Sequence, residues 1–332
     1  NLRRASMALE RENGALTLQV ETLTAVAAWD AKTFAEPGSV SNMLQSKLAE
    51  LEQRYSERPY VQLSLLNAVA VQLPYFGDYE GALGLWKRYL AQIKAQRGDA
   101  QQLLEGYIGA TKALFGMQRW SEMEAMAREG LAATASASGV AATRAELAHE
   151  LRIPLQIRGA RAEARASLEE HTRAVETSDQ SAHKVRWDNL LDLAGLELGH
   201  DDVEALQAAT RAHAGYAAHS DSTSSQLAIS AMFAGMAHTA IGQLKPAEGM
   251  LNTSLQYYAK VFSREHAESV RALSQLAQAL AAQGRYEESL QMLDERRRAA
   301  LFGEILRLGS QAWMTGTDRS AFASISNDAQ FL

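Results

Sequence analysis

The side chains that could carry metal or acid–base chemistry gather between residues 200 and 219. His200, Asp201 and Asp202 are consecutive and would offer one imidazole and two carboxylates to a metal ion. The same three residues also suit a turn in which an aspartate caps the helix that follows, and we adopt this interpretation. His213 and His219 are six residues apart and do not share a helical face, so we expect a solvated pair rather than two ligands.

The motifs of the common catalytic and nucleotide-binding sites are missing from the sequence. We find no P-loop, dinucleotide fingerprint, zinc-protease helix, serine-hydrolase elbow or calcium loop, and no signature of a protein kinase domain. The 332 residues include 8 His and no Cys, which excludes thiol nucleophiles, thiolate metal ligands and disulfides. We therefore expect a non-catalytic chain, with no catalytic residues, no metal and no cofactor.

The composition favours an all-α protein. Ala, Leu, Glu, Gln and Arg dominate, and there are only 5 Pro, so strong helix formers fill long stretches. A formal net charge of -6 gives no basic patch, and we expect no nucleic-acid partner. No stretch approaches the roughly 18 apolar residues that span a bilayer. The absence of Cys fits an oxidising compartment and the cytosol equally.

One local pattern recurs six times and must position whatever the chain binds. Residues 77–90 read GDYEGALGLWKRYL, and residues 284–296 read GRYEESLQMLDER. The leading residue of the pattern, which we call the turn anchor, recurs at steps of 40 to 43 residues. Glycine can adopt the left-handed conformation that ends a helix, so each anchor predicts a turn between two helices. The six turn anchors are Gly77, Gln118, Gly159, Gly199, Gly242 and Gly284.

Small and large side chains hold fixed positions around the anchors. A small residue follows most anchors by five positions and another precedes them by seven, which lets two paired helices approach closely. A large apolar residue nine positions after the anchor fills the space to the next pair. The residues that define the repeat are Gly77, Ala82, Trp86, Gly159, Ala164, Gly242, Ala247, Gly284 and Ser289.

This pattern across a helix–turn–helix resembles the tetratricopeptide repeat, over about residues 61–300. The resemblance implies a right-handed α-solenoid of about six helical hairpins, with helices about one turn longer than in the shortest form of the repeat, which has about 34 residues. Arg152 and Asp192 stand where the third and fourth repeats should have a small residue. In the fourth repeat, a shift of one position would let Ala205 replace Glu204 as the small residue.

The segments on either side of the array differ from it. Residues 1–60 are expected to form N-terminal capping helices, the second of which turns Leu44, Leu48 and Leu51 to one face. Residues 301–332 are expected to form a closing helix and a loosely ordered tail, because the last stretch shows no hydrophobic periodicity. The prediction is therefore a helical cap, an array of helix pairs and a closing segment.

The entry into the first repeat resembles a junction found in a group of bacterial membrane proteins. In that group, which includes eukaryotic-like serine/threonine kinases and winged-helix transcriptional regulators, a single membrane span precedes an extracytoplasmic tetratricopeptide array. The matching residues are Ser39, Val40, Leu44, Pro59, Val61, Gln62, Leu65 and Leu66. The resemblance implies a periplasmic sensor region of a transmembrane serine/threonine kinase, with juxtamembrane helices before residue 39 and the kinase domain outside this chain.

Two other roles stay open at the level of sequence. The same region could serve a transmembrane winged-helix transcriptional regulator, or the chain could be a cytoplasmic scaffold that joins partner proteins. In all three cases we expect a protein or peptide ligand, with self-association as a further possibility. In the two transmembrane cases, we expect contact with a membrane only through a span outside these residues.

The expected binding surface is the concave face of the solenoid, which the first helix of each pair lines. Positions 13, 10 and 6 before each anchor share one side of that helix and should point into the groove. Lys and Arg on several repeats would suit a carboxylate or an extended acidic segment. The candidate binding residues are Asn67, Glu105, Lys112, Glu146, His149, Arg186, Asn189, Arg271 and Gln278.

Overall fold

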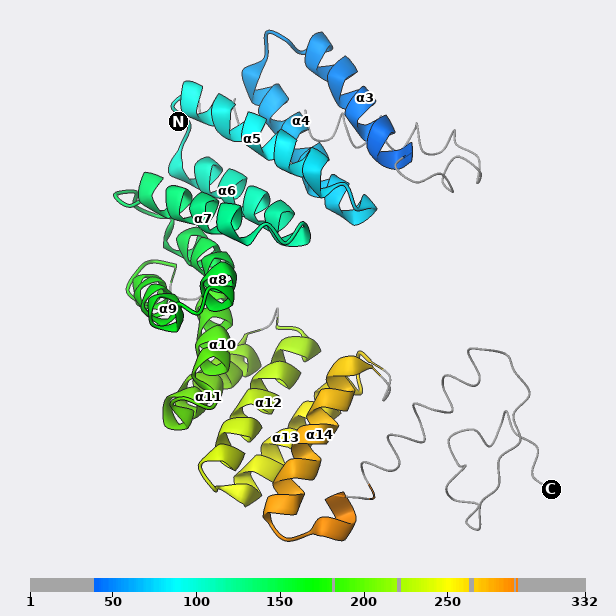
Figure 1. The fold of residues 1–332 in the computed structure, drawn as a ribbon. Helices are drawn as coiled ribbons and strands as arrows, with labels where there is room; N and C mark the ends of the chain where they lie inside the picture. The colour runs from blue at the N-terminus through cyan, green and yellow to red at the C-terminus, as the bar shows by residue number, and fades with distance from the viewer. Residues whose placement is uncertain (1–38, 181–182, 220–221, 263–265, 290, 292–332) are drawn as a thin grey trace, which may run out of the picture. The chain divides into compact units, whose positions relative to one another are not determined.

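A computed structural model describes residues 39–180, 183–219, 222–262, 266–289 and 291, and these residues are helical or form turns (Figure 1). Twelve α-helices and one short 3-10 helix cover this part of the chain, and it contains no strand. The prediction of an all-α fold is confirmed. The predicted first helix and the predicted segment 301–332 lie outside the described residues.

The chain divides into two compact units, the first ending at Val185 and the second beginning at Arg186. The helices of unit 1 are α3 Ser39–Arg54, α4 Pro59–Gln72, the 3-10 helix Leu73–Phe76, α5 Tyr79–Ala95, α6 Ala100–Gly116, α7 Trp120–Ala133, α8 Ala141–Ile157 and α9 Arg161–Glu176. Those of unit 2, in which α10 starts at the boundary, are α10 Val185–Glu197, α11 Asp202–Ala218, α12 Ser224–Ala240, α13 Leu244–Tyr258 and α14 Ala267–Ala282.

Each predicted repeat is a pair of helices, an A helix before the turn anchor and a B helix after it. In unit 1 the A helices are α4, α6 and α8, and the B helices are α5, α7 and α9. In unit 2 the A helices are α10, α12 and α14, and the B helices are α11 and α13. From α4 to α9, and again from α11 to α14, each helix packs against the next one in the chain. The predicted helical hairpins are therefore present in both units.

All six turn anchors have positive φ, from 57° at Gln118 to 80° at Gly284. In every turn except the one at Gly199, the N–H of the residue after the anchor donates to the carbonyl five residues earlier, at 2.8 to 3.1 Å. This is the hydrogen bond that closes a helix when the residue past its end is left-handed. At Gln118 the array imposes this conformation on a residue with a side chain.

The turn at Gly199 contains one residue more than the others. The other described B helices have their N-cap one position after the anchor, whereas α11 is capped by Asp201, two positions after Gly199. The Asp201 carboxylate accepts a hydrogen bond from the Glu204 N–H at 3.0 Å, which is the cap predicted from the sequence. Because of the extra residue, buried Ala205 takes the place of the small residue, and Glu204 stays partly exposed.

Small residues let the two helices of a pair approach each other. Ala82, Ala164 and Ala247 are fully buried on their B helices. In the last repeat, Ser289 follows the anchor by five residues, and its hydroxyl donates to the carbonyl of Ala277 on α14 at 2.7 Å. Such close contacts between the two helices of a pair require short side chains five positions after the anchor and seven positions before it.

Large residues fill the space between successive pairs. Trp86 on α5 is 4% exposed. A Cβ added at Gly109 on α6 would lie 2.1 Å from the Trp86 ring, so the indole occupies the space that a side chain at Gly109 would need. The next repeat thus carries a glycine where the aromatic ring of the previous repeat packs.

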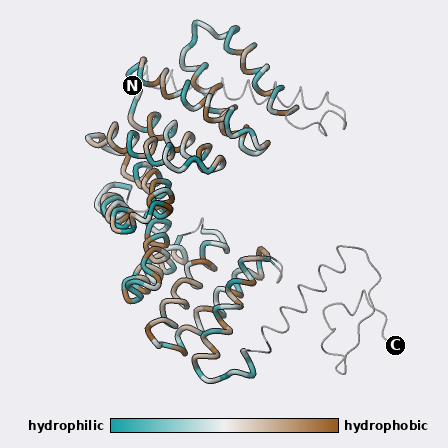
Figure 2. Tube along the Cα trace, in the orientation of Figure 1, coloured by the Kyte–Doolittle hydropathy of each residue, from teal (hydrophilic) through white to brown (hydrophobic). Residues whose placement is uncertain are grey.

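Helix α3 covers the start of the array. Leu44, Leu48 and Leu51 are buried in one cluster with Leu65 and Leu66 of α4, as the predicted apolar face requires. Figure 2 shows both hydrophilic and hydrophobic stretches along the described helices. None of the helices in the described ranges is long and apolar enough to cross a membrane.

Candidate functional site

The A-helix face, which we define as positions 13, 10 and 6 before each turn anchor, is built in unit 1 from neighbouring helices. Helix α4 contacts α6, and α6 contacts α8. Of the predicted binding residues, Lys112 is exposed, and Asn67, Glu105, Glu146 and His149 are partly exposed. Unit 1 therefore presents five of the nine predicted side chains on three adjoining A helices.

Polar side chains connect the A helices of unit 1 at this surface. The Thr143 hydroxyl on α8 donates to the Gln101 side-chain oxygen on α6 at 2.8 Å, and the Gln101 amide nitrogen donates to Glu105 at 3.2 Å. Glu146 lies 4.0 Å from the Nε2 atom of His183. In the part of the chain that the structure describes, no hydrogen bond or ion pair holds the Lys112 ammonium, which points a single positive charge at solvent.

In unit 2 the predicted residues have different surroundings. Arg271 and Gln278 on α14 are exposed, and the Arg271 guanidinium lies 5.7 Å from the ring centre of Phe233 on the adjoining A helix α12. Arg186 is partly exposed, and its guanidinium lies 4.7 Å from the ring centre of Trp187. Asn189 is fully buried.

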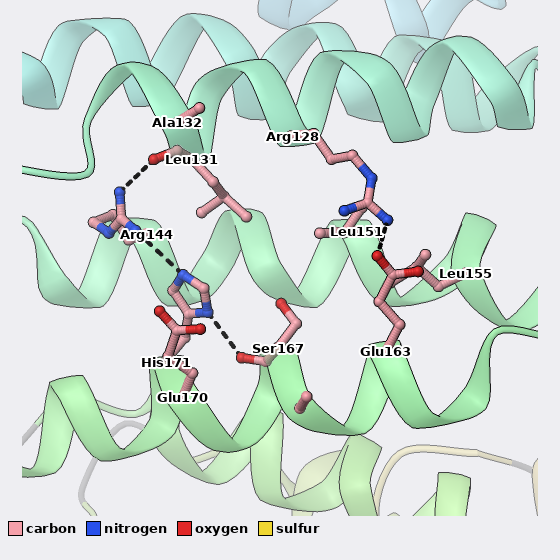
Figure 3. Close-up of a pocket in the computed structure, with 11 residues that line it drawn as sticks. Arg128, Leu131, Ala132, Arg144, Leu151, Leu155, Glu163, Ser167, Glu170 and His171 are labelled. Atoms are coloured by element: carbon pink, nitrogen blue, oxygen red, sulfur yellow. Dashed lines mark hydrogen bonds and ion pairs between the residues drawn. The ribbon is translucent and has the colours of Figure 1, made fainter.

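A pocket of about 480 Å³ opens on another side of unit 1, between the B helices α7 and α9 and in front of the A helix α8 (Figure 3). Three helices supply its lining. The lining residues are Arg128, Leu131 and Ala132 of α7, Arg144, Leu151 and Leu155 of α8, and Glu163, Ala166, Ser167, Glu170 and His171 of α9.

Arg144 holds one end of this pocket together. Its Nη1 atom donates to the Leu131 carbonyl at 2.7 Å and to the Thr134 hydroxyl at 3.0 Å, and its Nη2 atom lies 3.5 Å from Nε2 of His171. The guanidinium thus joins all three helices. Burial lowers the pKa of Arg144, but a guanidinium stays protonated in proteins, so the charge remains.

His171 is buried and acts as a neutral acceptor toward Arg144. Its Nδ1 atom lies 2.8 Å from the Ser167 carbonyl, which can only accept, so Nδ1 carries the proton and Nε2 accepts from Arg144. Burial lowers the pKa of His171, and the positive charge of Arg144 lowers it further. Imidazole therefore does not compensate the charge of Arg144; it orients the guanidinium.

The opposite end of the pocket is an ion-pair network. Arg128 bonds to both Glu124 and Glu163, and Arg158 bonds to the same two carboxylates, at 3.0 Å to Glu124 and 2.8 Å to Glu163. Hydrogen bonds from the two arginines lower the pKa of Glu163. Burial raises the pKa of Glu124, and separate hydrogen bonds from Arg158 and Arg128 outweigh it, so that the pKa of Glu124 is lowered as well. Figure 3 shows the Arg128–Glu163 pair at the end opposite to Arg144.

This pocket was not predicted, because its residues come from the other side of the A helix. Arg144, Leu151 and Leu155 are spaced by seven and four residues and share one face of α8, whereas Glu146 and His149 lie on the opposite side. Arg144 stands among apolar residues on one face of α8, and this charged residue in an apolar stripe could have indicated the pocket. No spacing rule joins that stripe to Glu170 and His171 on the following helix.

The residues first considered as metal ligands have structural partners. The Asp202 carboxylate accepts from the Gly199 N–H at 2.7 Å, beside the Asp201 cap. His213 and His219 are partly exposed rather than fully solvated as predicted, because each ring packs against an aromatic side chain, Tyr257 and Trp187 respectively. His213 lies 3.0 Å from the Ser230 hydroxyl, and the ring of His219 lies 5.2 Å from Trp187. Within the ranges that the structure describes, no three His, Asp or Glu residues gather as a metal site.

Comparison with known proteins supports the repeat assignment. Residues 226–301 match the tetratricopeptide repeat family. The structure is similar to the crystal structure of BtubC from P. vanneervenii, with a TM-score of 0.58, 17% identity, and coverage of 70% of this chain and 92% of that one. It is also similar to a putative kinesin light chain with nearly identical TPR-like repeats from Podosopora anserina, with a TM-score of 0.50, 22% identity, and coverage of 58% and 92%. These similarities concern the fold.

One short stretch has a curated relative of a different kind. Over 39 residues the chain is 64% identical to the DNA replication and repair protein RecF of Rhizobium rhizogenes, which corresponds to 12% of this chain and 10% of that protein. The chain thus spans about a tenth of the length of this relative. The fold of the described residues is that of a tetratricopeptide-type array of helix pairs.

Proposed function

We propose that this tetratricopeptide-type protein-interaction chain holds an acidic segment of a partner protein on its A-helix face. The observation that supports the proposal is the exposed ammonium group of Lys112, which has no counter-ion within the described residues. Lys112 lies on the A helix α6, which contacts the A helices α4 and α8. A surface cation of this kind is available to a carboxylate of a partner. Asn67 and His149 add partly exposed polar groups on the adjoining helices α4 and α8.

An experiment on the A-helix face can identify and test the partner. A photo-crosslinking residue is placed at Lys112, and in a matched control at Arg173, which is exposed on the B helix α9. A partner captured at position 112 is then purified, and its affinity is measured against the Lys112→Glu and Arg173→Glu variants. We expect charge reversal at Lys112 to weaken binding about tenfold or more, and reversal at Arg173 to leave it unchanged. Equal affinity of both variants would overturn the proposed surface.

As the finer role, we favour a sensor region that relays partner binding to a signalling domain across a membrane, by resemblance a serine/threonine kinase. The junction formed by residues 39–66 supports this assignment, and in the structure those residues form α3 and the start of α4. A cytoplasmic scaffold would present the same A-helix face and use it in the same way.

A topology experiment separates these two roles. A reporter that is active only outside the cytoplasm is fused to the array in the full-length gene product. Activity of the periplasmic reporter supports the sensor, and activity only of a cytoplasmic reporter supports the scaffold. If the sensor assignment is correct, adding the partner should change the oligomeric state of the full-length protein in detergent, measured by light scattering.

A further inference from the structure

The pocket between α7, α8 and α9 contains two charges of opposite sign that, among the residues that the structure describes, have no hydrogen-bonded counter-ion. The hydrogen bonds of Arg144 go to a carbonyl, a hydroxyl and a neutral imidazole. Glu170 is exposed, and in the described part of the chain its carboxylate forms no hydrogen bond or ion pair; it acts on Arg144 only over a longer distance. Figure 3 shows both residues at the same end of the pocket.

The other end of the pocket differs in this respect. Arg128 and Glu163 bond directly to each other and take part in a network with further partners. Charges that are already paired gain little from a ligand. Recognition of a charged ligand is therefore expected at Arg144 and Glu170, and not at the Arg128 end.

Arg144 is fixed in position and still has donors to offer. A guanidinium carries five N–H groups. Three of them are directed at Leu131, Thr134 and His171, which leaves the Nε–H and one Nη2–H for a ligand. A half-buried cation that no carboxylate of the described residues hydrogen-bonds favours binding of an anion, and a carboxylate matches the planar geometry of the remaining donors.

The middle of the pocket is apolar. Leu131 and Leu151 lie between the two charged ends, and Leu155 lies beyond Leu151 on the same face of α8 (Figure 3). The volume of about 480 Å³ is within the range of pockets that hold small molecules, about 300 to 1,000 Å³. The space next to Arg144 and Glu170 thus suits an apolar group attached to two opposite charges.

We propose that this pocket binds a free α-amino acid with a large apolar side chain. Its carboxylate bonds to Arg144, its ammonium group faces Glu170, and its side chain packs against Leu131 and Leu151. A zwitterion matches both unpaired charges at once, which neither a simple carboxylate nor a simple amine does. The inference concerns another side of unit 1 than the A-helix face, so it stands or falls independently of the proposed protein partner.

Ligands that differ in one charge test the proposal on the unmodified protein. Titration calorimetry is carried out with leucine, phenylalanine, leucine amide, which lacks the carboxylate, and N-acetyl-leucine, which lacks the ammonium charge. We expect leucine or phenylalanine to bind with a dissociation constant between roughly 10 µM and 1 mM, and both altered ligands to bind at least about tenfold more weakly. The proposal would be overturned if neither leucine nor phenylalanine showed saturable binding at concentrations up to about 10 mM. It would also be overturned if N-acetyl-leucine bound as tightly as leucine.

Variants of the two charged residues provide the second arm. Glu170→Gln should weaken leucine binding about tenfold and leave the affinity for N-acetyl-leucine unchanged, because that ligand has no ammonium group to lose. Arg144→Gln should abolish binding of both. The matched control is Arg173→Gln, an exposed arginine on the same helix as Glu170 but outside the pocket lining.

The variants are first compared by circular dichroism, so that a change in affinity is not confused with unfolding. Because Glu170 is exposed, its substitution is expected to leave the helices intact. If Glu170→Gln and Arg173→Gln bind leucine equally well, the ammonium site does not exist. If Arg144→Gln is folded and retains binding, the carboxylate site does not exist either.

Discussion

The helices α7, α8 and α9 in unit 1 and the helices α11, α12 and α13 in unit 2 have the same order, but they fill the space between their two B helices differently. In unit 1 the A helix sends Arg144 toward both B helices, and a pocket remains beside it. In unit 2 the A helix offers the small hydroxyl of Ser230, which lies 3.0 Å from Nδ1 of His213. The same order of helices is thus bridged by a long cation in unit 1 and by a short hydroxyl side chain in unit 2.

Both regions contain a histidine that burial keeps neutral, and its partner differs. His171 donates to a carbonyl of its own helix and accepts from Arg144. His213 meets Ser230 on the A helix, and its ring centre lies 6.3 Å from that of Tyr257 on α13. A neutral imidazole therefore orients Arg144 by accepting a hydrogen bond in unit 1 and packs against an aromatic ring in unit 2. For this reason the presence of a histidine does not by itself indicate a binding site.

The largest effect is expected from a large side chain between α12 and α13 in unit 2. A Cβ added at Gly235 on α12 would lie 2.6 Å from Leu251 Cγ and 3.3 Å from the carbonyl oxygen of Ala247. Gly235→Leu should therefore overpack the α12–α13 interface and lower the free energy of unfolding by about 3 kcal/mol. Urea unfolding followed by circular dichroism measures the loss.

Gly249 on α13 is the matched control for this substitution. A Cβ there would meet no atom within 4 Å, so Gly249→Ala should raise stability by about 0.5 to 1 kcal/mol through helix propensity. If Gly235→Leu were as well tolerated as Gly249→Ala, the view that α12 and α13 are held close by small residues would be wrong.

A smaller effect is expected from removal of the cation that holds the pocket end. Arg144→Ala deletes the hydrogen bonds to Leu131 and Thr134 and the packing of the arginine stem. We expect a loss of about 1 to 2 kcal/mol in the free energy of unfolding, measured by urea titration. Arg173→Ala, on the exposed side of α9, should change it by less than about 0.5 kcal/mol. Equal losses in the two variants would mean that Arg144 does not connect the helices.

The pH dependence of stability compares the two histidines. Burial lowers the folded-state pKa of both His171 and His213 below the ordinary value of 6.5, so the unfolded chain binds protons more readily. Their contribution to stability is therefore complete above about pH 6.5 and declines as the pH falls below it, by at most about 1.4 kcal/mol per pH unit for each residue.

Unfolding at pH 7.5 and pH 5.5 checks this expectation, each value being about one unit from the ordinary pKa. The wild type should lose stability toward the lower pH, and His171→Gln and His213→Gln should each lose less. If both variants follow the wild-type profile, the acid sensitivity of the chain comes from titratable groups other than these two histidines.

The smallest effect is expected at the ion-paired end of the pocket. Glu163 is exposed, and its partners Arg128 and Arg158 also bond to Glu124. Glu163→Gln should therefore leave the unfolding midpoint nearly unchanged, and added salt should reduce even that difference. A large loss of stability at low salt would show that the network, and not Arg144, joins α7 to α9.

The sequence predicted the repeat better than the pocket, for a physical reason. A turn anchor needs one backbone conformation at one residue, so glycine at a regular spacing indicates it, and even Gln118 was found from its spacing to the neighbouring anchors. The small residue beside each anchor is likewise a local requirement. The start of α11 was harder to predict, because the turn at Gly199 has one extra residue. The small side chain of Ala205 suggested this shift of one position, and the structure shows it.

The pocket depends on side chains from three helices, and no local pattern brings them together. Arg144 precedes its anchor by fifteen residues, while His171 and Glu170 follow it by twelve and eleven. These residues are close together because α7 and α9 both pack against α8. The spacing of residues within one helix does not predict such contacts between helices. The predicted A-helix residues, in contrast, follow from their position in the repeat, which determines the helix face on which each one lies.

The extra residue in the turn at Gly199 shows how a repeat chain can accommodate an insertion. One added residue rotates the start of the next helix by about 100°, which in a globular core would displace every later contact. Here Asp201 and Ala205 restore the cap and the small position within a single turn, and the following anchor at Gly242 has its usual conformation. Insertions are thus confined to the turn where they arise, and each repeat of the chain can diverge without carrying its neighbours with it.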